Sequence, residues 1–226
     1  MEDMYTLVKD FFSHDMDLDD LFDSEAIIWI DWREDDEDVV RYFNDMMAEP
    51  IDIEIVGNGK PYGDDIVLRK GDKELQIPYG DEQDRDVTIK YFNDFVKPDY
   101  EVRWFIESLG NDTLGFTVLS GAEWAKLDDE FGADTVRYYF EPIDFESDMF
   151  NLGMDEVFAL LALRENSEGV NTQFSTQLDW IRIINKEKNL TERKENGQID
   201  LKQYMVAKKE LQQSKDDFIA AHGPMK

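Results

Sequence analysis

Acidic side chains are concentrated in one part of this 226-residue sequence. Residues 151–226 hold 12 acidic and 11 basic side chains, so 41 of the 53 acidic and 13 of the 24 basic residues fall in 1–150. The total net charge is −29, and segment 1–150 alone carries −28. Self-repulsion on this scale opposes a compact state, so the segment needs a large apolar core with its carboxylates at the surface. A solubility bias or a salt-adapted proteome would make both parts of the chain acidic. An excess of acidic residues in one part alone indicates selection for an acidic surface on that part.

The composition supplies such a core and excludes several classes of protein. Hydrophobic residues make up 42% and aromatic residues 13% of the chain, which argues against disorder. The absence of cysteine excludes disulfides, thiolate nucleophiles and cysteine-based zinc sites. The sequence has no apolar run long enough to cross a bilayer and no signal-peptide pattern at its start. These features predict a cytoplasmic protein without membrane association.

Hydrophobic periodicity predicts an α+β fold for segment 1–150. Helical spacing predicts helices over 2–12, 35–48 and 84–97, and Ser120 and Glu123 form a capping-box pattern that opens a helix to Phe131, with Gly132 after it. Alternating or β-branched runs predict strands at 27–30, 51–55, 65–69, 74–78, 100–107, 113–119 and 135–140. We expect a mostly antiparallel sheet with helices packed on one face.

Two of the predicted helices share a sequence pattern. Val40–Asp45 aligns with Ile89–Asp94, and in both cases a proline and a predicted strand follow. The pattern indicates an internal duplication of a helix–strand unit. Such a duplication predicts two units that pair into a single sheet.

The segment 151–226 is predicted to be a helical C-terminal extension packed on the acidic domain 1–150. Helical periodicity covers 154–163 and continues from Phe174 to Ile184, and the polar stretch 185–197 is predicted to be a linker. Asp200 is expected to cap a long helix. Its apolar stripe repeats every seven residues and needs a partner surface. The alternatives for that surface are the preceding helix, the body of the domain and another molecule. The stripe consists of Tyr204, Leu211 and Phe218, widened by Leu201 and Met205.

The sequence carries no enzyme signature and no cofactor motif. The two histidines, His14 and His222, lie near the chain ends, and no nucleophile elbow, phosphate loop or dinucleotide fingerprint is present. Asp15, Asp17 and Asp19 match the first ligand positions of a calcium loop. However, Asp20 replaces the required glycine and Ala26 the bidentate glutamate, so we expect a solvated acidic loop. A calcium- or metal-binding regulator, or an enzyme whose carboxylates do acid–base work, is an alternative.

Acidic clusters are the best candidates for a binding site. One or two carboxylates satisfy a helix dipole, whereas four or five in a row add a long-range field that steers a cationic partner. We therefore expect a basic protein partner and no direct contact with nucleic acid, which a polyanionic surface repels. Neutralising Asp35 to Asp38 together is expected to slow association and leave the fold intact. The predicted partner-binding residues are Asp17, Asp19, Asp20, Asp23, Glu34, Asp35, Asp36, Glu37, Asp38, Asp81, Glu82, Asp84 and Asp86.

One stretch resembles a known class of binding protein. Trp104–Thr113, Phe116–Leu119, Glu123-Trp124 and Tyr138–Ile143 look like parts of the small acidic immunity proteins encoded beside bacterial polymorphic toxins. The resemblance implies a non-catalytic cytoplasmic inhibitor that occludes a toxin. A phage-type DNA mimic that blocks a host defence or nucleic-acid-processing enzyme is the alternative. Buried anchors for either interface could come from Trp29, Trp32 or Trp104, which ordinary core packing would equally explain.

Overall fold

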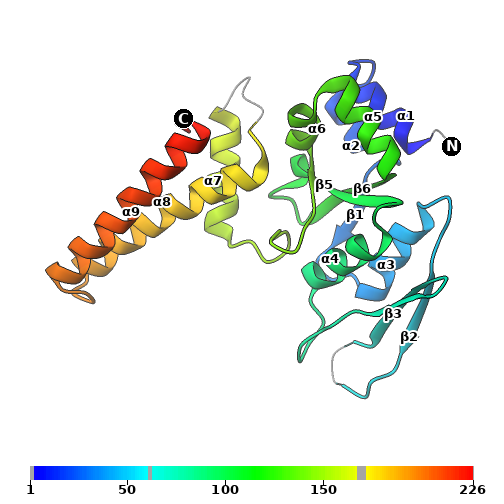
Figure 1. The fold of residues 1–226 in the computed structure, drawn as a ribbon, viewed down its shortest axis with the longest axis horizontal. Coiled ribbons are helices and arrows are strands. Elements are labelled where there is room, and N and C mark those ends of the chain that lie inside the picture. The colour runs from blue at the N-terminus through cyan, green and yellow to red at the C-terminus, as the bar shows by residue number, and fades with distance from the viewer. Residues whose placement is uncertain (1–2, 61–62, 167–171, 226) are drawn as a thin grey trace. The chain divides into compact units, whose positions relative to one another are not determined.

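The computed structural model describes residues 3–60, 63–166 and 172–225, which form two compact units. Unit 1 comprises Met1–Leu152 and unit 2 comprises Gly153–Lys226 (Figure 1). The division lies close to residue 150, where the charge balance of the sequence changes. Each unit is therefore described by itself.

Unit 1 has the predicted α+β architecture, with two antiparallel sheets. The larger sheet has the strand order β1-β6-β5-β7 and the smaller has the order β2-β3-β4. The elements in chain order are α1 (Met4–Phe12), α2 (Leu18–Phe22), β1 (Ile28–Asp31), α3 (Asp36–Asp45), β2 (Asp52–Val56), β3 (Asp65–Lys70), β4 (Lys73–Gln76), α4 (Arg85–Val96), β5 (Tyr100–Phe105), the 3-10 turn η1 (Ile106–Ser108), β6 (Thr113–Ser120), α5 (Gly121–Phe131), α6 (Ala133–Tyr139) and β7 (Phe140–Pro142).

Helices cover both faces of the four-stranded sheet, and not one face as expected. On one face Phe43 of α3 contacts Phe116 of β6, with ring centroids 5.7 Å apart. On the other face Trp124 of α5 packs against Phe140, with centroids 5.5 Å apart. Residues of β6 are consequently buried from Leu114 to Leu119 without alternation. The sequence of such a strand is a continuous apolar run without alternation. The run by itself did not show that helices cover both faces of the sheet.

The two repeated helices contact each other through equivalent residues. Phe43 of α3 and Phe92 of α4 occupy the same place in the repeat, and their ring centroids lie 5.7 Å apart. Asn44 and Asn93, the next residues, each bond the backbone of the segment that follows their helix. The following strands, however, enter different sheets, β2 the smaller and β5 the larger. The expectation of one shared sheet was therefore wrong.

The predicted strand 135–140 is mostly the helix α6, and only its last residue starts β7. Gly132 has a positive φ of 88° and accepts the amide of Val136, which opens the helix. Val136 and Phe140, four residues apart, are both fully buried, and the Tyr139 ring contacts Phe11 at 4.9 Å. Packing against α1 thus outweighs the strand preference of β-branched and aromatic residues.

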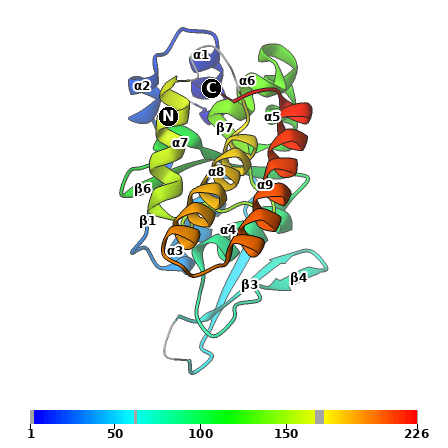
Figure 2. The same ribbon diagram turned by 90° about the vertical axis from the view of Figure 1, so that its left-hand side faces the viewer.

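Unit 2 consists of α7 (Met154–Asn166), α8 (Phe174–Glu195) and α9 (Leu201–His222). Helices α8 and α9 run side by side as an antiparallel hairpin (Figures 1 and 2). The prediction of a linker over 185–197 was wrong for most of that stretch, because its polar residues continue α8 as far as Glu195. Gly197, with a positive φ of 68°, lies just beyond the helix end. Lys215 of α9 pairs with Glu187 in this stretch, so the polar face contributes to the hairpin.

The stripe predicted on α9 faces α8. Phe218 is buried and packs on Trp180, with ring centroids 5.2 Å apart, and Tyr204 accepts a cation–π contact from Lys194. The expected cap is present, since Asp200 accepts from the Gln203 amide at 2.8 Å, and the Gln203 side chain accepts from the Asp200 amide to complete a capping box. Leu201 and Met205 were expected to widen the stripe but are more than half exposed. Tyr204 and Phe218 of the predicted stripe therefore contact α8, together with Lys215.

Candidate functional site

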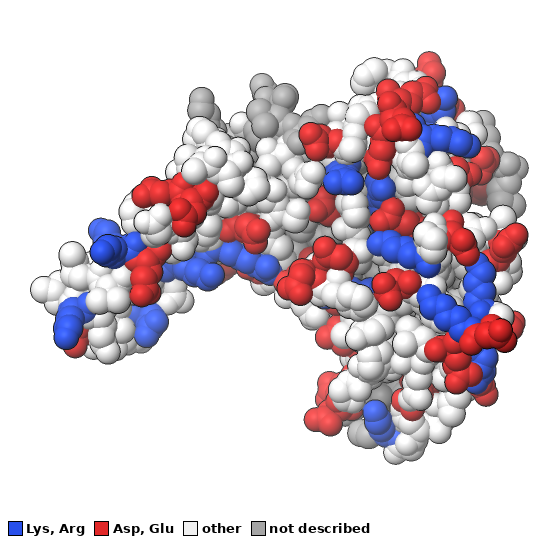
Figure 3. Space-filling view, viewed as in Figure 1, with Lys and Arg blue, Asp and Glu red and all other residues white. Residues whose placement is uncertain are grey.

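Most of the predicted partner-binding carboxylates lie at the surface of unit 1. Figure 3 shows carboxylates in several patches on this face of the unit, with Lys and Arg side chains between them. The exposed members of the set are Asp17, Asp19, Asp20, Asp23, Asp35, Asp81 and Glu82, and the half-buried members are Glu34, Glu37, Asp38 and Asp84. Folding therefore leaves most of this charge available to solvent or a partner.

Asp36 does not belong to the predicted binding surface. It is 4% exposed, and its Oδ1 accepts from Nε of Arg85 at 2.5 Å while its Oδ2 accepts from Oγ1 of Thr88 at 2.5 Å. Arg85 also donates to the carbonyl oxygens of Asp31, at 2.7 Å, and Glu34. A buried carboxylate is stable only when it is paired in this way, so Asp36 holds α3 to α4.

Asp86 is likewise structural. It is 1% exposed, and its carboxylate accepts from the backbone amides of Met149, Phe150 and Asn151 at 3.0, 2.9 and 3.3 Å. Burial raises the pKa of Asp86 above its ordinary value, and the three amides oppose that shift. The side chain thus anchors the end of unit 1 to the start of α4.

The structure brings two of the three acidic clusters together. Arg85 bonds Asp36 and the backbone of the 31–34 turn, so the 34–38 cluster adjoins the 81–86 cluster. Asp84 caps α4 by accepting from the Val87 amide at 3.1 Å. The third cluster, Asp17–Asp23, surrounds α2 before β1 begins, whereas Glu34 follows the end of β1. The predicted site is therefore two acidic surfaces at opposite ends of β1.

The Asp17–Asp23 cluster does not have the geometry of a calcium loop. Asp17 accepts from the Asp20 amide at 2.9 Å and caps the short helix α2, which contains Asp19 and Asp20. The expected acidic loop is therefore partly helical. In the part of the chain that the structure describes, no three His, Cys, Asp or Glu side chains come together in a group that could hold a metal ion.

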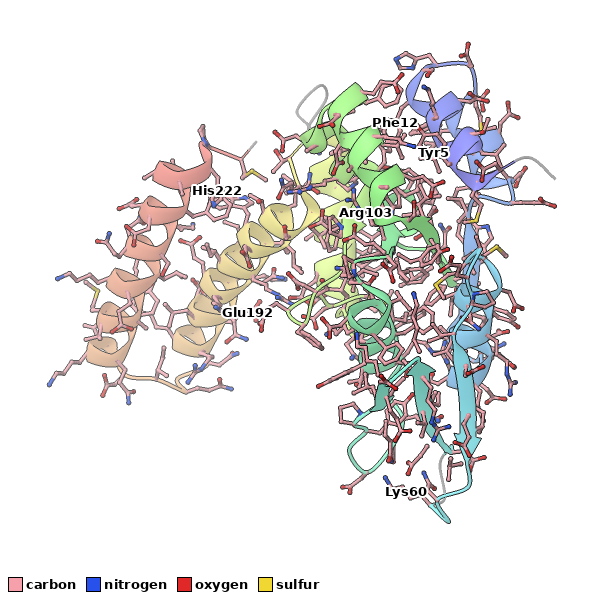
Figure 4. All side chains as sticks on the ribbon, turned by 45° about the vertical axis from the view of Figure 1, so that its right-hand side comes forward. Tyr5, Phe12, Lys60, Arg103, Glu192 and His222 are labelled. Atoms are coloured by element: carbon pink, nitrogen blue, oxygen red, sulfur yellow. The ribbon has the colours of Figure 1, made fainter. Side chains whose placement is uncertain are left out.

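A further acidic run, Asp128–Glu130, is partly neutralised by buried and surface cations. Arg103, labelled in Figure 4, is 4% exposed. It pairs with Glu101 at 3.1 Å and Asp128 at 3.4 Å, and its guanidinium lies over the Trp124 ring, 4.3 Å from the centroid. Glu130 pairs with Lys9 at 2.9 Å, and this hydrogen bond raises the pKa of Lys9. This end of α5 is therefore a less favourable site for a cationic partner.

An apolar cleft of about 470 Å³ lies beside β1 and was not predicted. Its lining consists of Met4, Glu25, Ile27, Ile28, Trp29, Tyr42, Asp45 and Met46. Met46 is 44% exposed, although its helical spacing places it on the same arc as the buried Val39 and Phe43. The adjacent methionines were the available signal, because neighbouring residues of a helix point in different directions, and Met47 is the buried one at 4% exposure.

The rim of this cleft is acidic. Glu25 and Asp45 line it and are exposed, yet neither was in the predicted set. The Tyr42 hydroxyl donates to Oε1 of Glu34 at 2.6 Å, and this bond raises the pKa of Tyr42. The hydrogen bond links the cleft to the 34–38 cluster, so apolar and acidic surfaces are continuous here.

The three candidate anchor tryptophans have different environments. Trp104 is 2% exposed and donates to Oγ of Ser108, so it belongs to the core. Trp29 is half-buried, contacts Phe22 in a tilted arrangement with ring centroids 4.4 Å apart, and lines the cleft. Trp32 is 61% exposed, and the Arg33 guanidinium lies over its ring. Trp29 and Trp32 are thus the two available for an interface.

Unit 2 has a separate groove of about 650 Å³ along α8 and α9. Its lining includes the cations Arg182, Lys186 and Arg193 together with Glu156 and Glu210. Arg182 pairs with Glu156 at 3.2 Å, so part of this charge is compensated. The groove has mixed charge and differs in kind from the acidic surface of unit 1.

No family model, curated protein or solved structure matches this chain. No helix in the described ranges has both the length and the apolar character needed to span a bilayer.

Proposed function

We propose that this chain is a non-catalytic cytoplasmic inhibitor that binds a basic effector protein through unit 1, most plainly an immunity protein that neutralises a toxin. The observation that carries the proposal is the negative charge of unit 1 that its own basic residues do not balance. Its 13 basic residues balance fewer than a third of its 41 acidic ones, and eleven of the thirteen predicted binding carboxylates remain exposed or half-exposed. Local structure uses only a few of these carboxylates.

The physical advantage of this surface is fast and selective association. Complementary potentials raise association rates by about 10–10³ and disfavour partners of like charge. Apolar anchors are also needed for a long-lived complex, because charge at an exposed rim contributes little to the dissociation rate. The cleft beside β1 and the exposed Trp32 supply apolar surface next to the acidic clusters.

The test is affinity capture from the native cell lysate at low salt, followed by stepwise elution with salt. Three baits are compared: the wild type, a unit 1 variant and a unit 2 variant. The unit 1 variant carries Asp35→Asn, Glu37→Gln, Asp38→Asn, Asp81→Asn and Glu82→Gln. The matched variant removes the same number of charges from exposed sites of unit 2, with Glu192→Gln, Glu195→Gln, Glu210→Gln, Asp216→Asn and Asp217→Asn.

A single basic protein that binds stoichiometrically to the wild type and the unit 2 variant, and weakly to the unit 1 variant, supports the proposal. If that protein is toxic when expressed alone and harmless when co-expressed with this chain, an immunity role is established. If it is instead a host defence or nucleic-acid-processing enzyme, the DNA-mimic alternative holds. A mixture of unrelated basic proteins, or equal loss with both variants, would refute specific inhibition.

A further inference from the structure

β1 is an open edge of the larger sheet. Within the described residues it pairs with β6 alone, in the register Ile28↔Phe116 to Asp31↔Thr113. Every second residue of an antiparallel edge strand turns its N–H and C=O away from its neighbour. The carbonyl of Asp31 accepts from Arg85, outside the ladder, so Trp29, two residues earlier, also turns its backbone groups outward. The N–H and C=O of Trp29 can therefore pair with another strand, whereas the Asp31 carbonyl is already bonded.

The apolar cleft lies along this edge. It is lined from one face of the sheet by Met4 of α1, from the other by Tyr42 of α3 and Met46 at the end of that helix, and between them by Ile28 and Trp29. β1 has four residues, a length of ~13 Å at about 3.3 Å per residue. The cleft thus offers pockets on both sides of a strand-length edge, which is the arrangement that strand addition uses.

The other sheet edges are protected. β7 has three residues, ends at Pro142 and is largely buried. β2 exposes the carboxylates of Asp52 and Glu54, and β4 exposes Lys73 and Glu74. Exposed charges of this kind discourage pairing at an edge. β1 has no charged residue between Ile28 and Ile30. The edge that lacks local protection is therefore the one with an apolar cleft and an acidic rim.

We propose that the β1 edge binds an extended, Lys- or Arg-bearing segment of the basic partner by strand addition. The inference rests on the proposed function, which supplies a basic protein partner. Alternate side chains of the added strand enter the apolar cleft, and the intervening cations meet Glu25 and Asp45 at its rim.

Charge complementarity selects this occupant over a second copy of the chain. Two β1 edges brought together would oppose their own acidic rims, formed by Glu25 and Asp45, within a unit of net charge −28. Like charges placed opposite each other on paired strands are destabilising. A cationic segment turns the same rim into an attraction.

The first test uses a short synthetic peptide in which Lys alternates with Val. Its control has the same composition, with the lysines and valines in separate blocks and a proline between them. Hydrogen–deuterium exchange on the full chain is expected to show protection of the Trp29 amide by the alternating peptide and not by the control. Equal protection by both peptides, or none at Trp29, would overturn the proposal. If the Trp29 amide is protected without peptide in a dimeric sample, the edge binds a second copy of the chain, and the proposal is likewise overturned.

The second test uses matched charge variants and the partner captured by the full chain. The cleft variant is Asp45→Lys with Met46→Lys, and the control is Asp52→Lys with Val56→Lys on the edge strand β2, where both residues are exposed. Both changes add the same charge to unit 1. The cleft variant is expected to weaken binding of peptide and partner about tenfold more than the control at equal ionic strength.

The outcomes separate the two proposals. If partner binding depends on salt and both variants weaken it equally, the proposed inhibitor function is supported and docking at β1 is refuted. If no partner is captured but the peptide protects Trp29, the edge assignment stands and the inhibitor function fails. If the cleft variant loses the circular dichroism signal of the folded protein, Asp45→Lys alone is used in its place. Asp45 is exposed and lies at the end of α3, so this single change should leave the fold intact.

Discussion

Arg85 and Asp36 form a buried ion pair between equivalent positions of the two repeated helices. The repeat aligns residue 40 with residue 89, and the same offset of 49 residues relates Asp36 to Arg85. The pair measures 2.5 Å, and both side chains are nearly inaccessible to solvent. The same offset relates Phe43 to Phe92, which are also in contact. The two helices therefore meet through matching residues, one pair polar and one pair aromatic.

Replacement of Asp36 by Ala should destabilise unit 1 by about 3–5 kcal/mol, because Arg85 would remain buried without its counter-ion. The free energy of unfolding from urea titration, followed by tryptophan fluorescence, measures the change. Asp35→Ala is the control, since Asp35 is exposed and its side chain makes no capping hydrogen bond. A loss for Asp36→Ala no larger than that of the control would show that the pair is not a structural tie.

The repeated asparagines should differ in their contribution to stability. Asn93 is 1% exposed, accepts from the Val102 amide at 2.8 Å and donates to the Ile143 carbonyl at 2.9 Å. Asn44 makes a matching pair of bonds to Ile51 in a partly exposed setting. Asn93→Ala should cost roughly 2–3 kcal/mol and Asn44→Ala about 1 kcal/mol, because water can replace only the latter bonds. Equal losses in urea unfolding would contradict this difference in burial.

The stability that depends on Asp86 should decrease as pH rises. Its pKa is raised in the folded state, so the folded chain binds the proton more tightly than the unfolded chain. The resulting contribution is fully present below the ordinary pKa of 3.8 and is lost as pH rises through the folded pKa. The free-energy difference between wild type and Asp86→Asn should thus shrink as pH rises above the ordinary pKa of 3.8. Asp81→Asn, at an exposed site, should show no such trend, and a difference that grows with pH would reverse the assignment.

Association with the basic partner should depend on three exposed or half-exposed carboxylates of the 34–38 cluster. Asp35→Asn, Glu37→Gln and Asp38→Asn together should slow association about tenfold at low salt. The effect should vanish near 1 M salt, where the Debye length is about 3 Å. Stopped-flow kinetics measure the rates, with Glu210→Gln, Asp216→Asn and Asp217→Asn in α9 as the control. Asp36 must stay unchanged, because the fourfold neutralisation expected to preserve the fold would break its buried ion pair.

Local sequence signals determined the backbone of this protein well where the relevant contacts are local. The capping box of Ser120 and Glu123 and the cap at Asp200 were readable because the bonded groups lie three residues apart. Hydrophobic alternation likewise identified most strands of an α+β fold. It failed for α6, where the contact of Tyr139 with Phe11 outweighs local preference.

Only the tertiary structure decided which carboxylates are available for binding. Asp35 and Asp36 are neighbours of the same chemical type, yet one is exposed and the other is buried against Arg85, 49 residues away. The cleft beside β1 likewise combines residues from α1, β1 and α3. Burial and edge exposure depend on long-range packing, which the periodicity of one segment does not encode. The sequence by itself thus determined the sign and the segment of the charge, and the fold determined where that charge meets an apolar surface.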